Sequence, residues 1–144
     1  MNNTHRTKKI CISFDFHNDS RYRYLLTALK ENESSLIDFE DLTPGEINSS
    51  DVGRVKASLS QKIGDSTHLL VIVGEHANEL HSDYLLIGDR NWQWWEINKA
   101  KSLGKKLIAV KINSTNLSPD PLLNSGTSWA MSFTVDKILK GINE

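Results

Sequence analysis

Leu69-Leu70-Val71-Ile72-Val73 is the stretch that decides the fold, because five apolar residues follow one another there without a polar residue between them. A strand with one face in water alternates apolar and polar side chains, whereas a strand that is buried on both faces does not. Gly74 follows the run directly and marks its end. The stretch therefore predicts a central strand of a parallel sheet that helices cover on both faces.

Strand-like and helix-like segments alternate on both sides of this stretch. The expected strands are residues 9–16, 36–39, 69–73 and 106–112, separated by loops that include 40–47, 74–90 and 113–128. The expected helices are one that Asp19 or Ser20 caps, one from a cap within 48–51 to Gly64, one from Asn91 to near Gly104, and one through Val135, Ile138, Leu139 and Ile142. This alternation predicts an α/β fold with a central parallel sheet of four to five strands and helices on both faces.

Length and composition exclude several classes of protein. We expect 144 residues to form one domain, over 9–144, after a disordered leader at 1–8. The 17 basic and 18 acidic residues give a net charge of -1, which offers no electrostatic basis for nucleic-acid binding. Cys11 is the single cysteine, so an intrachain disulfide is excluded. Because the leader has no apolar segment and no apolar run could span a bilayer, we expect a cytoplasmic protein without a membrane partner.

The segment Asn-Trp-Gln-Trp-Trp-Glu-Ile-Asn-Lys-Ala at 91–100 is typical of a helix that begins after Asn91 as its N-cap. With about 100° per residue, an apolar stripe is formed by Trp92, Ile97, Ala100 and Leu103. Glu96 lies about 40° from Trp92 by the same count, inside the stripe. A carboxylate on the inward face of a helix is costly unless it is paired, hydrogen-bonded or next to a cavity.

Two interpretations of Glu96 stay open on this pattern. An acid near a helix N-terminus is stabilised by the macrodipole, and Lys99 stands at a helical spacing for an ion pair, so the role could be structural. Alternatively, ligands of parallel sheets bind at the carboxyl ends of the strands, where this helix begins, and Glu96 then points toward a binding site. We expect Trp94 and Trp95 to be exposed, which favours a partner surface under either interpretation.

Several familiar sites are absent or weakly supported. No Gly-x-Gly-x-x-Gly or Walker A motif follows a strand, and the third strand does not end in the Asp of a phospho-receiver domain. Asp15, His17 and Asp19 could gather around a metal, but a solvated loop with a helix cap explains them equally well, and we assign no metal site. His76 and His81 have no clear partner nucleophile.

Three ordered segments, Ile10 to Asp19, Asp41-Leu42-Thr43-Pro44-Gly45 and Trp92-Gln93-Trp94-Trp95-Glu96, carry a resemblance to a known family. They resemble the first-strand box, the BB loop and the Trp-x-x-x-Glu motif of TIR (Toll/interleukin-1 receptor) domains, of the stand-alone kind found in Thoeris antiphage defence. The likeness spans residues 9–112, and Glu40 departs from the Arg that many TIR domains have there. The resemblance implies a flavodoxin-like TIR fold.

The resemblance also implies cleavage of NAD at the nicotinamide–ribose bond, with Glu96 as the catalytic residue. Nicotinamide leaves as a neutral ring and needs no general acid, so that one ionised carboxylate can bind the ribose hydroxyls and stabilise the oxocarbenium-like centre. The resemblance assigns substrate binding to Phe14, Asp15, Phe16, His17, Asp41 and Trp92. Their aromatic rings would stack on a base, and His17 and Asp41 would bind ribose or phosphate. NAD is the substrate, and no cofactor is expected.

Capture of the ribosyl centre by a nucleophile of the same molecule would give a cyclic ADP-ribose isomer. Thoeris-like proteins use such products as messengers, which implies a separate effector protein as a partner and an NAD glycohydrolase or ADP-ribosyl cyclase activity here, with possible self-association into a homo-oligomer. The alternative is a non-catalytic TIR-like interaction module. A third hypothesis is a small flavodoxin-like nucleotide-binding protein with an unrelated ligand.

Overall fold

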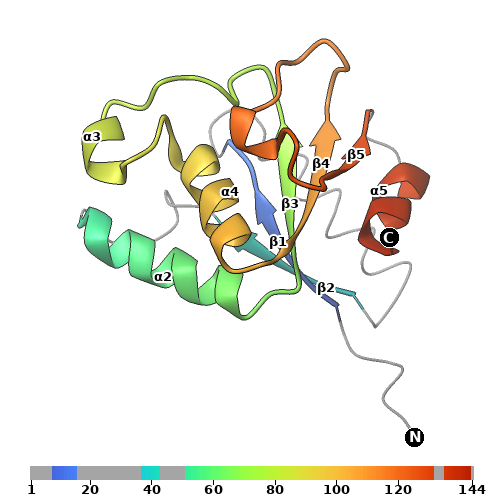
Figure 1. The fold of residues 1–144 in the computed structure, drawn as a ribbon, viewed down its shortest axis with the longest axis horizontal. Coiled ribbons are helices and arrows are strands. Elements are labelled where there is room, and N and C mark those ends of the chain that lie inside the picture. The colour runs from blue at the N-terminus through green and yellow to red at the C-terminus, as the bar shows by residue number, and fades with distance from the viewer. Residues whose placement is uncertain (1–7, 16–36, 43–50, 132–134, 144) are drawn as a thin grey trace, which may run out of the picture.

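Five parallel strands form one sheet at the centre of the protein, seen in a computed structural model that describes residues 8–15, 37–42, 51–131 and 135–143. The strands are β1 (Lys8–Ser13), β2 (Ile37–Leu42), β3 (His68–Val73), β4 (Lys106–Lys111) and β5 (Ser128–Ala130), in the spatial order β2-β1-β3-β4-β5 (Figure 1). The predicted parallel α/β fold is confirmed. Lys8, expected in a leader, is instead the first residue of β1.

The predicted central strand occupies the middle of this sheet. All six residues of β3 are buried, and β3 pairs with β1 on one side and β4 on the other. Its side chains alternate between two core clusters, so Leu69, Val71 and Val73 face one side of the sheet and Leu70 and Ile72 face the other. The absence of alternation in the sequence is thus explained by a core on each face.

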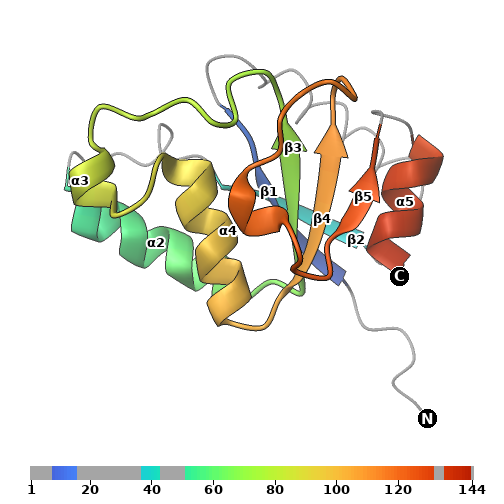
Figure 2. The ribbon, with the colours of Figure 1, turned by 45° about the horizontal axis from the view of Figure 1, so that its top comes forward.

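Helices cover both faces of the sheet. The helices α2 (Val52–Gly64) and α4 (Trp92–Ser102) pack on one face through their apolar residues, whereas α5 (Val135–Asn143) packs on the other (Figure 2). Asp51 caps α2 through a 2.8 Å bond from the Gly53 amide, in agreement with the predicted cap. Among the helices of the described residues, none combines the length and the apolar content that crossing a bilayer demands.

The structure differs from the expected elements in one strand and in two loops. β2 continues to Leu42, into the expected loop 40–47, because it pairs with β1 along its whole length. The expected loop 74–90 contains a short helix, α3 (Tyr84–Ile87), and the expected loop 113–128 contains a 3-10 turn, η2 (Asp120–Leu122), before β5. The helix predicted after Asp19 or Ser20 lies outside the described residues.

Candidate functional site

The helix α4 begins where the sequence places it, and its cap fixes the preceding loop. The Asn91 side chain accepts a 3.0 Å hydrogen bond from the Trp94 amide, and its Nδ2 donates to the carbonyl oxygens of Ala77 and Glu79, both at 2.9 Å. Trp94 Nε1 adds a 3.0 Å bond to Asn78 Oδ1. These bonds hold residues 77–79 of the loop after β3 against the first turn of α4, at the carboxyl edge of the sheet.

The inward-facing acid of α4 is almost fully buried against the end of β1. Glu96 is 1% exposed, and its Oε1 accepts a 2.5 Å hydrogen bond from Ser13 Oγ. Its Oε2 is also buried and has no hydrogen-bond partner among the described residues. No ion pair joins Glu96 to Lys99 within the part of the chain that the structure describes. The predicted inward orientation of Glu96 is therefore confirmed, and the proposed pairing with Lys99 is not found there.

Burial strongly perturbs the titration of this carboxyl. Desolvation raises the pKa of Glu96 from its ordinary value of 4.5 to about 8, and the hydrogen bond from Ser13 acts in the opposite direction. The ionised form is disfavoured because the buried site supplies few dipoles in place of water. At neutral pH the free protein therefore holds Glu96 mostly as the uncharged acid, one turn into a helix and beside the strand ends.

A second buried polar side chain on α4 contacts the same strand ends. Gln93, 6% exposed, donates from Nε2 to the carbonyl oxygens of Ser13 at 3.3 Å and Ile72 at 3.0 Å. No site role is predicted for Ser13 or Gln93 from the sequence. The available signals were a polar residue within the apolar run 9–16 and a glutamine three residues before Glu96, on the same helix face.

The other predicted site residues do not all gather around Glu96. Trp92 is half-buried, packs against the core beneath α4, and meets Trp95 edge to face with ring centroids 5.8 Å apart. Phe14 is 3% exposed and belongs to the core cluster of the opposite sheet face. Asp15 is half-buried just after β1. Asp41 lies in β2, opposite Ile12 of β1, and Phe16 and His17 lie outside the described residues.

Three details of the tryptophan helix differ from the expected pattern. Trp94 and Trp95 are half-buried rather than exposed, because the Trp94 indole bonds to Asn78 and Trp95 packs against the core. Leu103, expected in the buried stripe, is 43% exposed. The helix ends at Ser102, and the chain turns away through Gly104, whose φ of 70° suits a residue without a Cβ. Large exposed apolar side chains do lie together on α3, where Leu85 and Leu86 are exposed.

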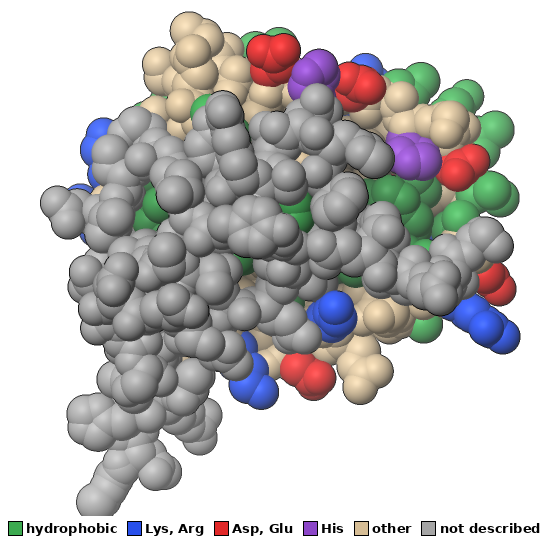
Figure 3. Space-filling view, turned by 180° about the vertical axis from the view of Figure 1, so that it is seen from behind, with side chains coloured by type: hydrophobic (Ala, Val, Ile, Leu, Met, Phe, Trp, Pro, Cys, Tyr) green, Lys and Arg blue, Asp and Glu red, His purple; other side chains and the backbone are tan. Residues whose placement is uncertain are grey.

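A histidine between two acids lies at the same edge of the sheet. His76 Nδ1 lies 2.7 Å from Glu79 Oε2, and His76 Nε2 lies 3.4 Å from Glu75 Oε1. Figure 3 shows a histidine flanked by acidic side chains along the edge toward which the strands point. The hydrogen bond with Glu79 raises the pKa of His76, to which Glu75 and Asp15 also contribute. Among the described residues, no three His, Cys, Asp or Glu side chains gather as metal ligands.

An open cavity of about 480 Å³ lies beside α4 but does not include Glu96. Its lining combines half-buried Trp94 with polar and charged side chains, among them Arg90 of the loop before α4, Lys111 of β4 and Asp120 of η2. Residues 94 and 96 project in different directions from a helix, so this cavity and the Glu96 carboxyl are separate features. The chemistry of the site therefore follows from Glu96 and not from the volume of this cavity.

Comparison with solved structures shows that the fold is shared with proteins of low sequence identity. A 2-deoxyribosyltransferase from Leishmania mexicana is 15% identical, with a TM-score of 0.61 over 95% of this chain and 98% of that one. A 2-deoxyribosyltransferase from Bacillus psychrosaccharolyticus is 12% identical, with a TM-score of 0.59 over 90% and 89% of the two chains. A prokaryotic SEFIR domain is 13% identical, with a TM-score of 0.55 over 95% and 94%. The flavodoxin-like, TIR-like fold is thereby confirmed.

A protein-family model identifies the family of this chain, whereas the solved structures show only its fold. No curated protein matches the chain. The model described as Thoeris protein ThsB, TIR-like domain, matches residues 11–117, which run from within β1 to beyond β4 and include both Ser13 and Glu96. This match covers well over half of the 144 residues and confirms the resemblance found in the sequence. The chain belongs to the TIR-like domain family of the Thoeris protein ThsB.

Proposed function

We propose that this TIR-like domain cleaves NAD at its nicotinamide–ribose bond and makes a cyclic ADP-ribose-type signal nucleotide in antiphage defence. The observation that carries the proposal is the Glu96 carboxyl, which is 1% exposed and has one oxygen without a partner among the described residues. Burying an unsatisfied carboxyl destabilises a fold, so its presence at the carboxyl edge of a parallel sheet favours a ligand-binding role. Membership of a Thoeris family supports the defence context.

The raised pKa is compatible with this chemistry because the substrate carries a positive charge. A cationic nicotinamide ring placed near Glu96 favours the ionised carboxylate and lowers the pKa of Glu96 from about 8. The unpaired Oε2 can then accept a hydrogen bond from a ribose hydroxyl. As nicotinamide leaves, positive charge develops on the ribose, and a carboxylate in a poorly solvated site stabilises it.

The fate of the ribosyl centre decides the product. Attack by water would give linear ADP-ribose, whereas attack by a nucleophile of the same molecule would give a cyclic isomer. A buried carboxyl whose surroundings exclude water favours the second outcome. The two similar structures named as 2-deoxyribosyltransferases indicate that proteins of this fold include enzymes that transfer a sugar. At their low sequence identity the similarity to this chain is one of fold alone.

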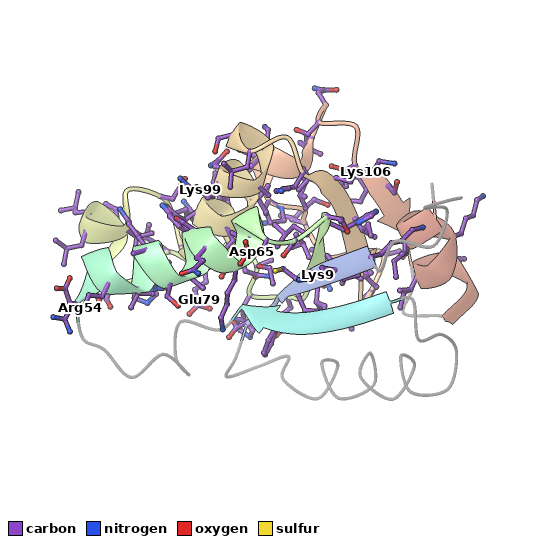
Figure 4. The ribbon with its side chains drawn as sticks, turned by 90° about the horizontal axis from the view of Figure 1, so that it is seen from below. Lys9, Arg54, Asp65, Glu79, Lys99 and Lys106 are labelled. Carbon is purple, nitrogen blue, oxygen red and sulfur yellow. The ribbon has the colours of Figure 1, made fainter. Side chains whose placement is uncertain are left out.

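The test is product analysis of NAD incubated with concentrated protein, by chromatography and mass spectrometry. Glu96→Gln keeps the shape of the side chain and removes its charge. Asp65→Asn is the matched control, because Asp65 is an exposed acid at the end of α2, just before β3 begins (Figure 4). We expect wild type and Asp65→Asn to release nicotinamide and a product with the mass of cyclised ADP-ribose, and Glu96→Gln to release neither. Equal turnover by all three proteins would exclude the role given to Glu96.

A second candidate function is a non-catalytic interaction module, and the surface of α3 is the observation that favours it. Leu85 is 80% exposed and Leu86 is 65% exposed, with Leu80 nearby at 52%. Exposed apolar side chains that lie together on one element are a common mark of a protein–protein surface. The second function would replace the first on two results together. Neither the wild type nor any variant would cleave NAD, and the double substitution Leu85→Ser with Leu86→Ser would abolish self-association measured by light scattering.

A further inference from the structure

We propose that Ser13 and Gln93 are positioning residues for Glu96: the Ser13 hydroxyl fixes one carboxyl oxygen, Gln93 fixes the strand end that carries Ser13, and the other carboxyl oxygen is thereby directed at the substrate. This inference rests on the proposed function of Glu96 and deepens it. Neither residue needs to touch the substrate for this role.

Ser13 supplies the hydrogen bond that the Glu96 carboxyl receives. The bond from Ser13 Oγ to Glu96 Oε1 is 2.5 Å long, and Ser13 is completely buried. A glutamate side chain has three rotatable bonds, and one short bond to a residue of a central strand removes much of that freedom. Because this bond occupies Oε1, the unpaired Oε2 is the atom left for a ligand.

Gln93 holds the end of β1 that carries Ser13. Ser13 and Val71 are the last residues paired between β1 and β3, so the ladder between these strands ends there. The Gln93 amide then reaches both strands, donating to the Ser13 carbonyl at 3.3 Å and to the Ile72 carbonyl at 3.0 Å. Since Gln93 and Glu96 lie three residues apart on α4, the Gln93 amide and the Glu96 carboxyl lie on the same face of the helix.

The surroundings leave Ser13 as the main polar influence on the carboxyl. The side chains that β3, β4 and α2 bury in the core cluster on this sheet face are apolar, and the titratable group that β1 buries there is the Cys11 thiol. The charged residues that alternation places on the same face, Lys9 of β1 and Lys111 of β4, are exposed and half-buried, respectively. The influences on the Glu96 pKa are burial and the Ser13 bond. A polar network with a purely structural role would satisfy its buried atoms. This network satisfies the strand carbonyls and leaves one Glu96 oxygen unpaired.

The decisive variant is Ser13→Ala, with Ser13→Thr as the conservative rescue and Ser66→Ala as the matched control. Ser66 is also a buried serine, but its hydroxyl donates to the Lys62 carbonyl at 2.6 Å instead of to Glu96. The first readout is the pKa of the Glu96 carboxyl, followed by carbon NMR in the free protein. We expect Ser13→Ala to raise that pKa, and Ser13→Thr and Ser66→Ala to leave it near the wild-type value. An unchanged pKa in Ser13→Ala would overturn the inference.

The second readout is kcat/KM for NAD as a function of pH. We expect Ser13→Ala to lower kcat/KM by about 10- to 100-fold and to move its acid limb to higher pH, with recovery in Ser13→Thr. Gln93→Met, which keeps the length but removes the donors, should lower kcat with a smaller shift of the limb. A wild type without any NAD turnover would contradict the proposed function, and the NMR titration would still decide the role of Ser13. Unaltered kinetics in a folded Ser13→Ala protein would overturn the positioning role of Ser13.

Discussion

The Ser13 hydroxyl at the end of β1 donates a 2.5 Å hydrogen bond to the Glu96 carboxyl on α4, joining residues that are 83 positions apart in the chain. This contact links the central sheet to the helix that carries the acid, and both partners are buried. The carboxyl has a second oxygen without a partner among the described residues.

The stability of the protein should fall as the pH rises through the range in which Glu96 titrates. The pKa of Glu96 is raised in the folded protein, from 4.5 to about 8, so the folded state keeps a proton that the unfolded chain has released. The free energy of unfolding should decrease by up to about 1.4 kcal/mol per pH unit between these values. Urea unfolding across this range should show that Glu96→Gln removes the slope and is the more stable protein at high pH. An identical slope in both proteins would contradict the burial of an acid.

The pH dependence of NAD cleavage should report the same carboxyl. In kcat/KM, which reflects the free enzyme, activity should rise with pH through an apparent pKa near 8. In kcat, which reflects the bound state, the limb should lie at lower pH, because the cationic substrate favours the ionised carboxylate. Steady-state rates from pH ~5 to ~9 measure both limbs. Coincident limbs in the two profiles would argue against a charge interaction between Glu96 and the nicotinamide ring.

Removal of the cap of α4 should destabilise the protein and loosen the loop that precedes the helix. Asn91 accepts from the Trp94 amide and donates to two loop carbonyls, so Asn91→Ala should cost at least about 1 kcal/mol. Asn98→Ala is the control, since exposed Asn98 bonds only to the Asp89 side chain among the described residues. Thermal unfolding of both variants gives the comparison. Equal stability of the two would show that the cap contributes little.

The histidine at the carboxyl edge of the sheet should titrate above its ordinary range. Its hydrogen bond with Glu79 is the largest cause of the raised His76 pKa, and the Glu75 contact is longer, at 3.4 Å. Proton NMR should therefore show that Glu79→Gln lowers the pKa of His76 more than Glu75→Gln does. The reverse order would mean that the observed pairing does not persist in solution.

The fold could be predicted because its signals are local. The uninterrupted apolar run of β3 indicated burial on both faces, and the caps Asp51 and Asn91 placed two helices correctly. β5 could not be found in this way, because a three-residue strand exists only through its pairing with β4. Leu103 was placed wrongly because the periodicity was extended past the last helical residue, where the helical face no longer applies.

The candidate site was predictable only in part, because local sequence signals do not report contacts between distant segments. Helical spacing alone placed Glu96 on the inward face, and the structure confirms that orientation. The residues that hold it, Ser13 and Gln93, depend on which strand lies under α4, and that is a property of the sheet order β2-β1-β3-β4-β5. The predicted roles of Phe14, Asp15, Asp41 and Trp92 in substrate binding remain predictions.

The catalytic role of Glu96 is tested most directly by nicotinamide release from NAD, measured for wild type and for Glu96→Gln at equal concentration and with folding verified for both. We expect turnover by the wild type and a loss of at least about 100-fold in the variant, because the carboxylate stabilises charge that develops only in the transition state. Equal nicotinamide release by the two proteins would contradict this expectation, since no role in cleavage would then remain for the buried carboxyl beside Ser13.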